Sequence, residues 1–86
     1  MNQTQFVKKR LETALAYAHA ALEQPTPERV ALARTCASYA LALEKHATLD
    51  RVASDEERGQ IVRMRGQLET VLGLIGRRSS GLADLG

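Results

Sequence analysis

Apolar residues recur at three- and four-residue steps in the first part of the chain. They are Val7, Leu11, Ala14, Leu15, Ala18 and Leu22. This spacing predicts an amphipathic helix over residues 4–23, because an α-helix turns by about 100° per residue. Pro25 marks its end, since proline disfavours helix at the residue before it. The next helix can then begin with Thr26 as N-cap and Pro27 as its first helical residue.

The second expected helix, over residues 27–48, carries two apolar strips side by side. The bulky strip consists of Leu32, Cys36, Tyr39 and Leu43, and the small strip consists of Ala33, Ala37 and Ala40. We expect a helix with so much apolar surface to contact neighbours on two sides. Small side chains let helices approach closely, so the small strip is expected to pack within the chain; the alternative is a homodimer seam. Cys36 is interpreted as a small core residue.

A third helix is expected over residues 55–77. Ser54-Asp55-Glu56-Glu57 has the pattern of a capping box, with acidic residues where the helix dipole favours them. The apolar seam that follows keeps three- and four-residue spacing throughout: Ile61, Met64, Leu68, Val71 and Ile75. Arg77 and Arg78 lie where a helix C-terminus favours positive charge. Residues 79–86 contain Ser and Gly and are expected to form a flexible C-terminal tail.

Three helices joined by short connections predict an all-α fold, an antiparallel three-helix bundle made of a helical hairpin plus a third helix. We expect it to form one domain over residues 1–78. The alternative is a long two-helix hairpin, because no Gly or Pro between Glu28 and Arg58 would interrupt a helix near residue 50.

The charge and cysteine content limit the classes of function. The net charge is only +2, with both signs interspersed along the chain, and this suits a solvated helical surface better than a nucleic-acid footprint. Cys36 is the only cysteine, so an intrachain disulfide is excluded. No apolar run approaches the roughly 18 residues needed to cross a bilayer, and no signal-peptide stretch is present. We expect a cytoplasmic protein that does not contact membranes.

Residue patterns for catalysis or metal binding are missing from the sequence. His19 and His46 lack a partner ligand at metal-binding spacing. The chain has no phosphate-binding loop, nucleophile elbow or paired-cysteine motif. We therefore expect no enzymatic activity, no metal and no cofactor.

The third expected helix contains a glycine stripe, defined by Gly59, Gly66 and Gly73, at seven-residue intervals. This interval places the three on one face, nearly opposite the apolar seam. Each glycine inside a helix costs about 1 kcal/mol relative to alanine, so we hypothesise a groove that admits a partner backbone. Its predicted partner-binding residues are Gly59, Arg63, Gly66, Thr70, Gly73 and Arg77. The alternative is that the spacing is accidental in a chain rich in Ala, Arg and Gly.

These observations favour a small helical interaction module, an adaptor, inhibitor or chaperone-like protein, that binds a partner protein or a copy of itself. The alternative is a helical regulator that binds nucleic acid through the arginines of the third helix. Few aromatic side chains are available to stack on bases, since the chain has two tyrosines, one phenylalanine and no tryptophan.

The layout of the segment from Leu11 to Leu43 resembles the small helical-hairpin co-chaperones of type III secretion systems. The likeness consists of Leu11-Glu12-x-Ala14-Leu15, a short turn and an Ala-rich second helix. It covers less than half of the chain, and the simplest members of that group lack a third helix. The resemblance implies that an apolar face of the hairpin shields an aggregation-prone secreted subunit.

Overall fold

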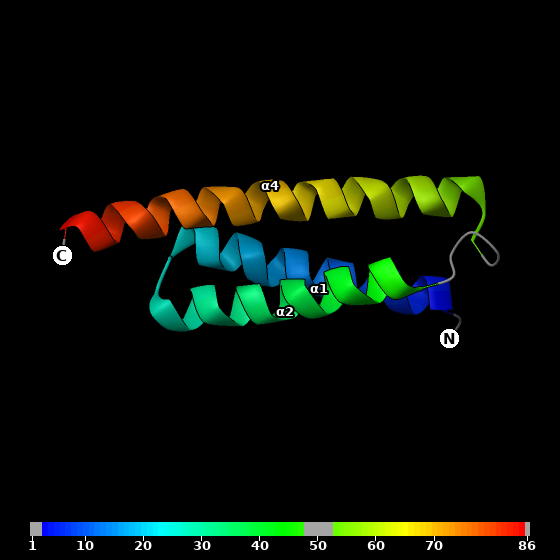
Figure 1. The fold of residues 1–86 in the computed structure, drawn as a ribbon, viewed down its shortest axis with the longest axis horizontal. Coiled ribbons are helices and arrows are strands. Elements are labelled where there is room, and N and C mark those ends of the chain that lie inside the picture. The colour runs from blue at the N-terminus through cyan, green and yellow to red at the C-terminus, as the bar shows by residue number, and fades with distance from the viewer. Residues whose placement is uncertain (1–2, 48–52, 86) are drawn as a thin grey trace.

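The described residues form three α-helices in which the first helix lies between the other two. A computed structural model describes residues 3–47 and 53–85, with side chains described as far as Arg78. Helices α1 (Gln3–Glu23) and α2 (Pro27–His46) form an antiparallel hairpin, and α4 (Asp55–Leu85) runs along α1 in the same direction as α1 (Figure 1). Helix α1 packs against both α2 and α4, whereas α2 and α4 make little contact. This arrangement confirms the all-α three-helix fold and shows that the long two-helix hairpin is wrong.

The connection between α1 and α2 forms as the sequence predicts. Thr26 is the N-cap of α2, and its side-chain oxygen accepts a hydrogen bond from the backbone N–H of Arg29 at 3.2 Å. Pro27 opens the helix, where its missing N–H leaves no hydrogen bond unmade. The Arg29 side chain reaches back across the turn and donates to the carbonyl oxygen of Ala20 at 3.5 Å.

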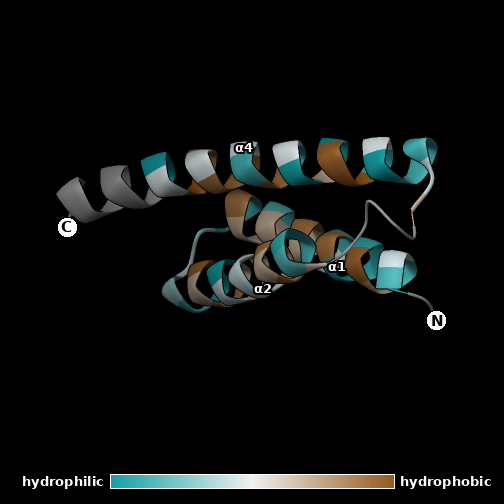
Figure 2. Cartoon of the chain, turned by 45° about the vertical axis from the view of Figure 1, so that its right-hand side comes forward, coloured by the Kyte–Doolittle hydropathy of each residue, from teal (hydrophilic) through white to brown (hydrophobic). Residues whose placement is uncertain are grey.

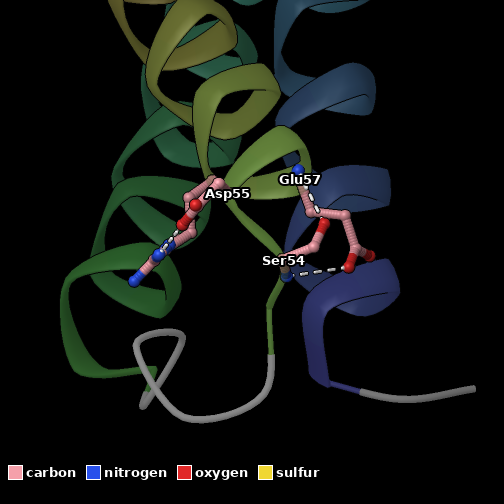
Figure 3. Close-up of polar contacts among 4 residues, drawn as sticks. Ser54, Asp55 and Glu57 are labelled. Atoms are coloured by element: carbon pink, nitrogen blue, oxygen red, sulfur yellow. Dashed lines mark hydrogen bonds and ion pairs between the residues drawn. The ribbon is translucent and has the colours of Figure 1, made fainter.

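Local capping also separates α2 from α4. Helix α2 ends at His46, and Ala47 follows in an extended conformation, so the helix is slightly shorter than the predicted 27–48. At the start of α4, the Ser54 N–H donates to Glu57 Oε1 at 3.1 Å, and the Glu57 N–H donates to Ser54 Oγ at 3.2 Å (Figure 3). The predicted capping box is therefore confirmed.

Helix α4 is longer than the sequence predicts. It continues to Leu85, so the predicted end of the third helix at residue 77 is wrong. The flexibility expected for residues 79–86 stays a prediction, and residue 86 lies outside the described part. No proline follows Arg78, and none of the described glycines has the positive φ of a typical helix C-cap. The Arg78 guanidinium donates to the carbonyl oxygen of Leu22 at the end of α1. Beyond this contact, the last turns of α4 project past the hairpin (Figure 1).

A thin core of aliphatic side chains runs along α1. The core includes most of the predicted apolar seam of α4: Ile61, Leu68, Val71 and Ile75 are buried. Met64, the remaining seam residue, is half-buried and packs against the core. Hydrophobic residues recur along α4 with polar residues between them (Figure 2). In α1 and α2 the buried apolar residues are smaller, with Leu11 the largest: Val7, Leu11, Ala14, Ala18, Ala21, Val30, Ala33, Ala37 and Ala40.

The two strips of α2 have opposite environments. The small strip is buried within the chain, which confirms its intrachain packing and excludes it as a homodimer seam. From the bulky strip, Leu32 and Tyr39 are 46% and 50% exposed, while Cys36 and Leu43 are half-buried against the core. The expected burial of α2 on two sides is therefore wrong for the outer half of its bulky strip. The buried residues of both α1 and α2 include several alanines, and such small residues let two helices approach closely.

None of the helices in the described part of the chain has the length and apolar character required to cross a membrane.

Candidate functional site

The glycine stripe lies on the solvent side of α4, as its spacing predicts. Gly59, Gly66 and Gly73 are all exposed. A Cβ atom added at any of the three would meet nothing within 4 Å. No close approach inside this chain therefore requires glycine at these positions, and a side chain there would project into open space.

Only part of the predicted partner-binding set gathers at one depression. Arg63, Gly66 and Thr70 line an open hollow of about 580 Å³ together with Gln67, Val71 and His19. The lining of this hollow does not include Gly59, Gly73 or Arg77. The Thr70 hydroxyl donates to the carbonyl oxygen of Gly66 at 2.9 Å, so its proton is already engaged along the helix. The binding role of the six residues stays a prediction.

His19 also lines this hollow, which no spacing pattern in the sequence predicts. It comes from α1, and only the packing of α1 along α4 brings it beside Gly66 and Thr70. A spacing argument finds residues that share one helix, but it cannot find a residue contributed by a neighbouring helix.

The arginines of α4 are divided among different environments. Arg65 forms an ion pair with Glu44 of α2 at 3.0 Å, and Arg58 pairs with Asp55 on its own helix. Arg78 is bound to the α1 carbonyl described above. Arg63 and Arg77 are exposed on the glycine side of the helix, away from Arg65 and Arg58. These positive charges therefore do not form one continuous surface.

A second surface lies on the α1–α2 hairpin, on the side away from α4. Lys8 marks the α4 side of α1, because its ammonium donates to Gln60 of α4 at 2.7 Å. Arg10 points in nearly the opposite direction, since two residues rotate a helix by about 200°. There its guanidinium lies over the ring of Tyr39 of α2, with 5.3 Å between the guanidinium carbon and the ring centroid. This contact identifies the side of the hairpin to which both helices contribute.

We call this surface the hairpin face. It contains the bulky strip of α2, which is half-buried at Cys36 and Leu43, and the neighbouring side chains of α1, including all the aromatic residues of the chain. Its apolar members are Phe6, Tyr17, Leu32, Cys36, Tyr39 and Leu43. Tyr17 is 42% exposed, in addition to the exposed Leu32 and Tyr39. Phe6, Cys36 and Leu43 are half-buried. The face is therefore an apolar surface, built from two helices, that the rest of the described chain covers only in part.

Arg10 is held at one end of the hairpin face by two aromatic rings. Its guanidinium carbon lies 5.2 Å from the centroid of the Phe6 ring, one turn earlier on α1, as well as 5.3 Å from that of Tyr39. Attraction between the cation and the two rings favours this position. Among the described residues, Arg10 has no hydrogen-bond or ion-pair partner. The four-residue spacing of Phe6 and Arg10 is visible in the sequence. The contact of Arg10 with Tyr39 depends on how α1 is aligned along α2, and this alignment is known only from the structure.

The described residues include no group of three His, Cys, Asp or Glu side chains that could hold a metal ion. The expected lack of a metal, a cofactor and an enzymatic activity stays a prediction.

Comparisons with known proteins add no relative. No protein-family model matches the chain. No curated protein and no solved structure matches it either. The resemblance of residues 11–43 to hairpin co-chaperones therefore also stays a prediction.

Proposed function

We propose that this protein is a small non-enzymatic helical module that binds a partner protein, as an adaptor, inhibitor or chaperone. The observation that carries the proposal is the partly uncovered hairpin face, with Tyr17, Leu32 and Tyr39 all at least two-fifths exposed. Contiguous exposed apolar surface on a small protein is typical of interaction sites. Aromatic and arginine side chains are also enriched where proteins bind one another.

A cytoplasmic location is part of the proposal. The single cysteine, Cys36, has no second thiol in the chain with which to pair, and a reducing compartment suits such a protein.

Nucleic-acid binding through α4 is the alternative, and the placement of its arginines gives it less support. A nucleic-acid surface needs several cations that converge on one backbone path. Arg58 and Arg65 are engaged in ion pairs with Asp55 and Glu44. The aromatic rings that could stack on bases are on the hairpin face and not beside these arginines.

The test compares two pairs of exposed apolar residues. The double variant Leu32→Gln with Tyr39→Gln removes the exposed part of the bulky strip. A matched control, Val62→Gln with Leu74→Gln, changes two side chains of α4 that are 51% and 40% exposed. Each full-length protein is immobilised, proteins from a lysate of the source organism are captured, and the retained proteins are compared quantitatively.

We expect the wild-type protein and the α4 control to retain the same partner, and the hairpin variant to lose it. Equal retention by both variants would contradict a docking role for the hairpin face. Fluorescence anisotropy with labelled duplex DNA and single-stranded RNA tests the alternative. Tight binding at low salt that weakens steeply as salt is added would favour the nucleic-acid function.

A further inference from the structure

Positive charge accompanies the apolar side chains at one end of the hairpin face. Lys9 and Arg10 are both exposed there. Two acidic residues of the hairpin are directed elsewhere, because Glu44 is paired with α4 and Glu12 lines a depression against α4. Glu28 lies in the first turn of α2, at the opposite end of the hairpin from Arg10. Glu23 ends α1 and lies at the same end of the hairpin as Glu28. Within residues 3–47, the basic groups beside the apolar surface therefore have no acidic group placed next to them.

The position of Arg10 suits it to bind a carboxylate. Phe6 and Tyr39 cover the guanidinium carbon, but the N–H donors of a guanidinium lie in its plane and point outward from its edge. None of these donors is used by another described residue. A carboxylate can accept two of them in parallel, which makes the contact both strong and directional. Because the rings already restrict the side chain, less conformational freedom is lost when the carboxylate binds.

A small hollow lies next to this guanidinium. Its volume is about 200 Å³, and it is lined by Phe6, Lys9, Arg10 and Thr13. Sites for small molecules and cofactors usually have roughly 300 to 1,000 Å³, so this hollow is too small for such a ligand. Its size suits a single side chain presented by a larger partner.

We infer that the hairpin face binds an amphipathic helix with acidic flanks, and that Arg10 binds a carboxylate of that helix. The apolar side of the ligand helix covers Leu32 and Tyr39 and places one side chain in the hollow beside Phe6. An acidic residue one turn away on the ligand then lies beside the guanidinium, because residues three or four apart share a helix face. The inference rests on the proposed function and specifies the chemistry of its partner.

A second copy of this chain is a less suitable occupant. A twofold dimer brings the same surface of each copy together. Where the twofold axis lies near Lys9 and Arg10, these residues of the two copies approach one another, and like charges oppose such a contact. A dimer through this face is therefore an outcome that would overturn the inference.

The experiment uses two synthetic peptides and the full-length protein. The first peptide has about 18 residues, or roughly five helical turns, with leucines at helical spacing along one side and glutamates on both flanks. The second peptide has glutamine in place of every glutamate. Binding is measured by isothermal titration calorimetry at physiological ionic strength, and light scattering records the mass of the protein alone across a concentration range.

The protein variants separate Arg10 from general positive charge. Arg10→Lys keeps the charge but removes the planar pair of donors. Arg34→Lys is the matched control, since Arg34 is exposed on α2 and lies nearly opposite Cys36 and the hairpin face. Circular dichroism and thermal unfolding confirm that each variant is folded as the wild type.

We expect the glutamate peptide to bind at least about tenfold more tightly than the glutamine peptide, as one charge-assisted hydrogen-bonded contact would produce. Arg10→Lys should lower the affinity for the glutamate peptide by about five- to tenfold, whereas Arg34→Lys should change this affinity by less than about twofold. Equal affinity of the two peptides, or equal effects of the two variants, would overturn the inference. So would a concentration-dependent dimer that Leu32→Gln abolishes.

Failure of the inference can be distinguished from failure of the proposed function. If neither peptide binds but the capture experiment still depends on Leu32 and Tyr39, the acidic-helix ligand is wrong and the protein-binding module stands. If capture shows no dependence on these residues either, both are wrong.

Discussion

The hairpin face and the outer face of α4 are both turned to solvent, yet they differ in how their residues are held. On α4, the glycine stripe borders open space, and each glycine lowers the helix propensity without a visible contact in return. On the hairpin, the guanidinium of Arg10 lies over rings contributed by two helices, beside exposed apolar side chains. Regular spacing within one helix is therefore weaker evidence for a binding site than side chains that two helices position together.

The largest expected effect comes from replacing the glycine stripe. The triple variant Gly59→Ala, Gly66→Ala and Gly73→Ala should raise the free energy of unfolding by about 3 kcal/mol, or about 1 kcal/mol for each residue. Each added methyl group meets open space, and alanine loses less backbone entropy in a helix. Urea denaturation measures the change.

Partner capture by the same triple variant shows which of the two faces binds the partner. Unchanged capture is expected if the hairpin face is the docking surface. Higher stability together with lost capture would instead support a groove along the glycine stripe. A fall in stability would mean that the glycines meet a contact that the described residues do not reveal.

An intermediate effect is expected at the contact between α1 and α2. Ala37→Leu should lower the free energy of unfolding by about 1 to 3 kcal/mol, because a larger side chain overpacks a buried site. The matched change Ala42→Leu, at an exposed position of the same helix, should alter it by about 0.5 kcal/mol or less. Thermal unfolding followed by circular dichroism measures both. Similar losses for the two variants would contradict the assignment of the small strip to the interior.

The smallest expected effect is on the hairpin face itself. Leu32→Gln should change the free energy of unfolding by about 0.5 kcal/mol or less, because this side chain already contacts solvent. Val62→Gln on α4 should change the free energy of unfolding by a similarly small amount. If Leu32→Gln unfolds the protein, the leucine is needed for folding, and a loss of capture by its variants could no longer be attributed to docking.

Much of the fold could be predicted from sequence because helix boundaries depend on neighbouring residues. Thr26 and Pro27 begin α2, and Ser54 and Glu57 begin α4, through hydrogen bonds and backbone restrictions that span only a few positions. The seam of α4 was also predictable from its period. The end of α4 was not, since Arg78 is followed by residues that neither stop a helix nor require it to continue.

The candidate sites were less predictable than the helices. The sequence indicated that the glycine stripe shares one outward face, and this is where the structure places it. It did not indicate His19 beside Gly66, because that proximity needs the packing of α1 along α4. Nor did it indicate the contact of Arg10 with Tyr39, whose residues are far apart in the chain.

The helical character of the chain, the first residues of two helices and the apolar side of α4 follow from the sequence alone. They depend on hydrogen bonds between near neighbours and on the spacing of apolar residues. Which of the two apolar strips of α2 is buried depends instead on how α1 packs against α2. Both strips have helical spacing, and alanine contributes less apolar area than leucine or tyrosine. Close packing of α1 against α2 nevertheless favours the small strip at their contact. That choice leaves Leu32 and Tyr39 exposed and creates the hairpin face.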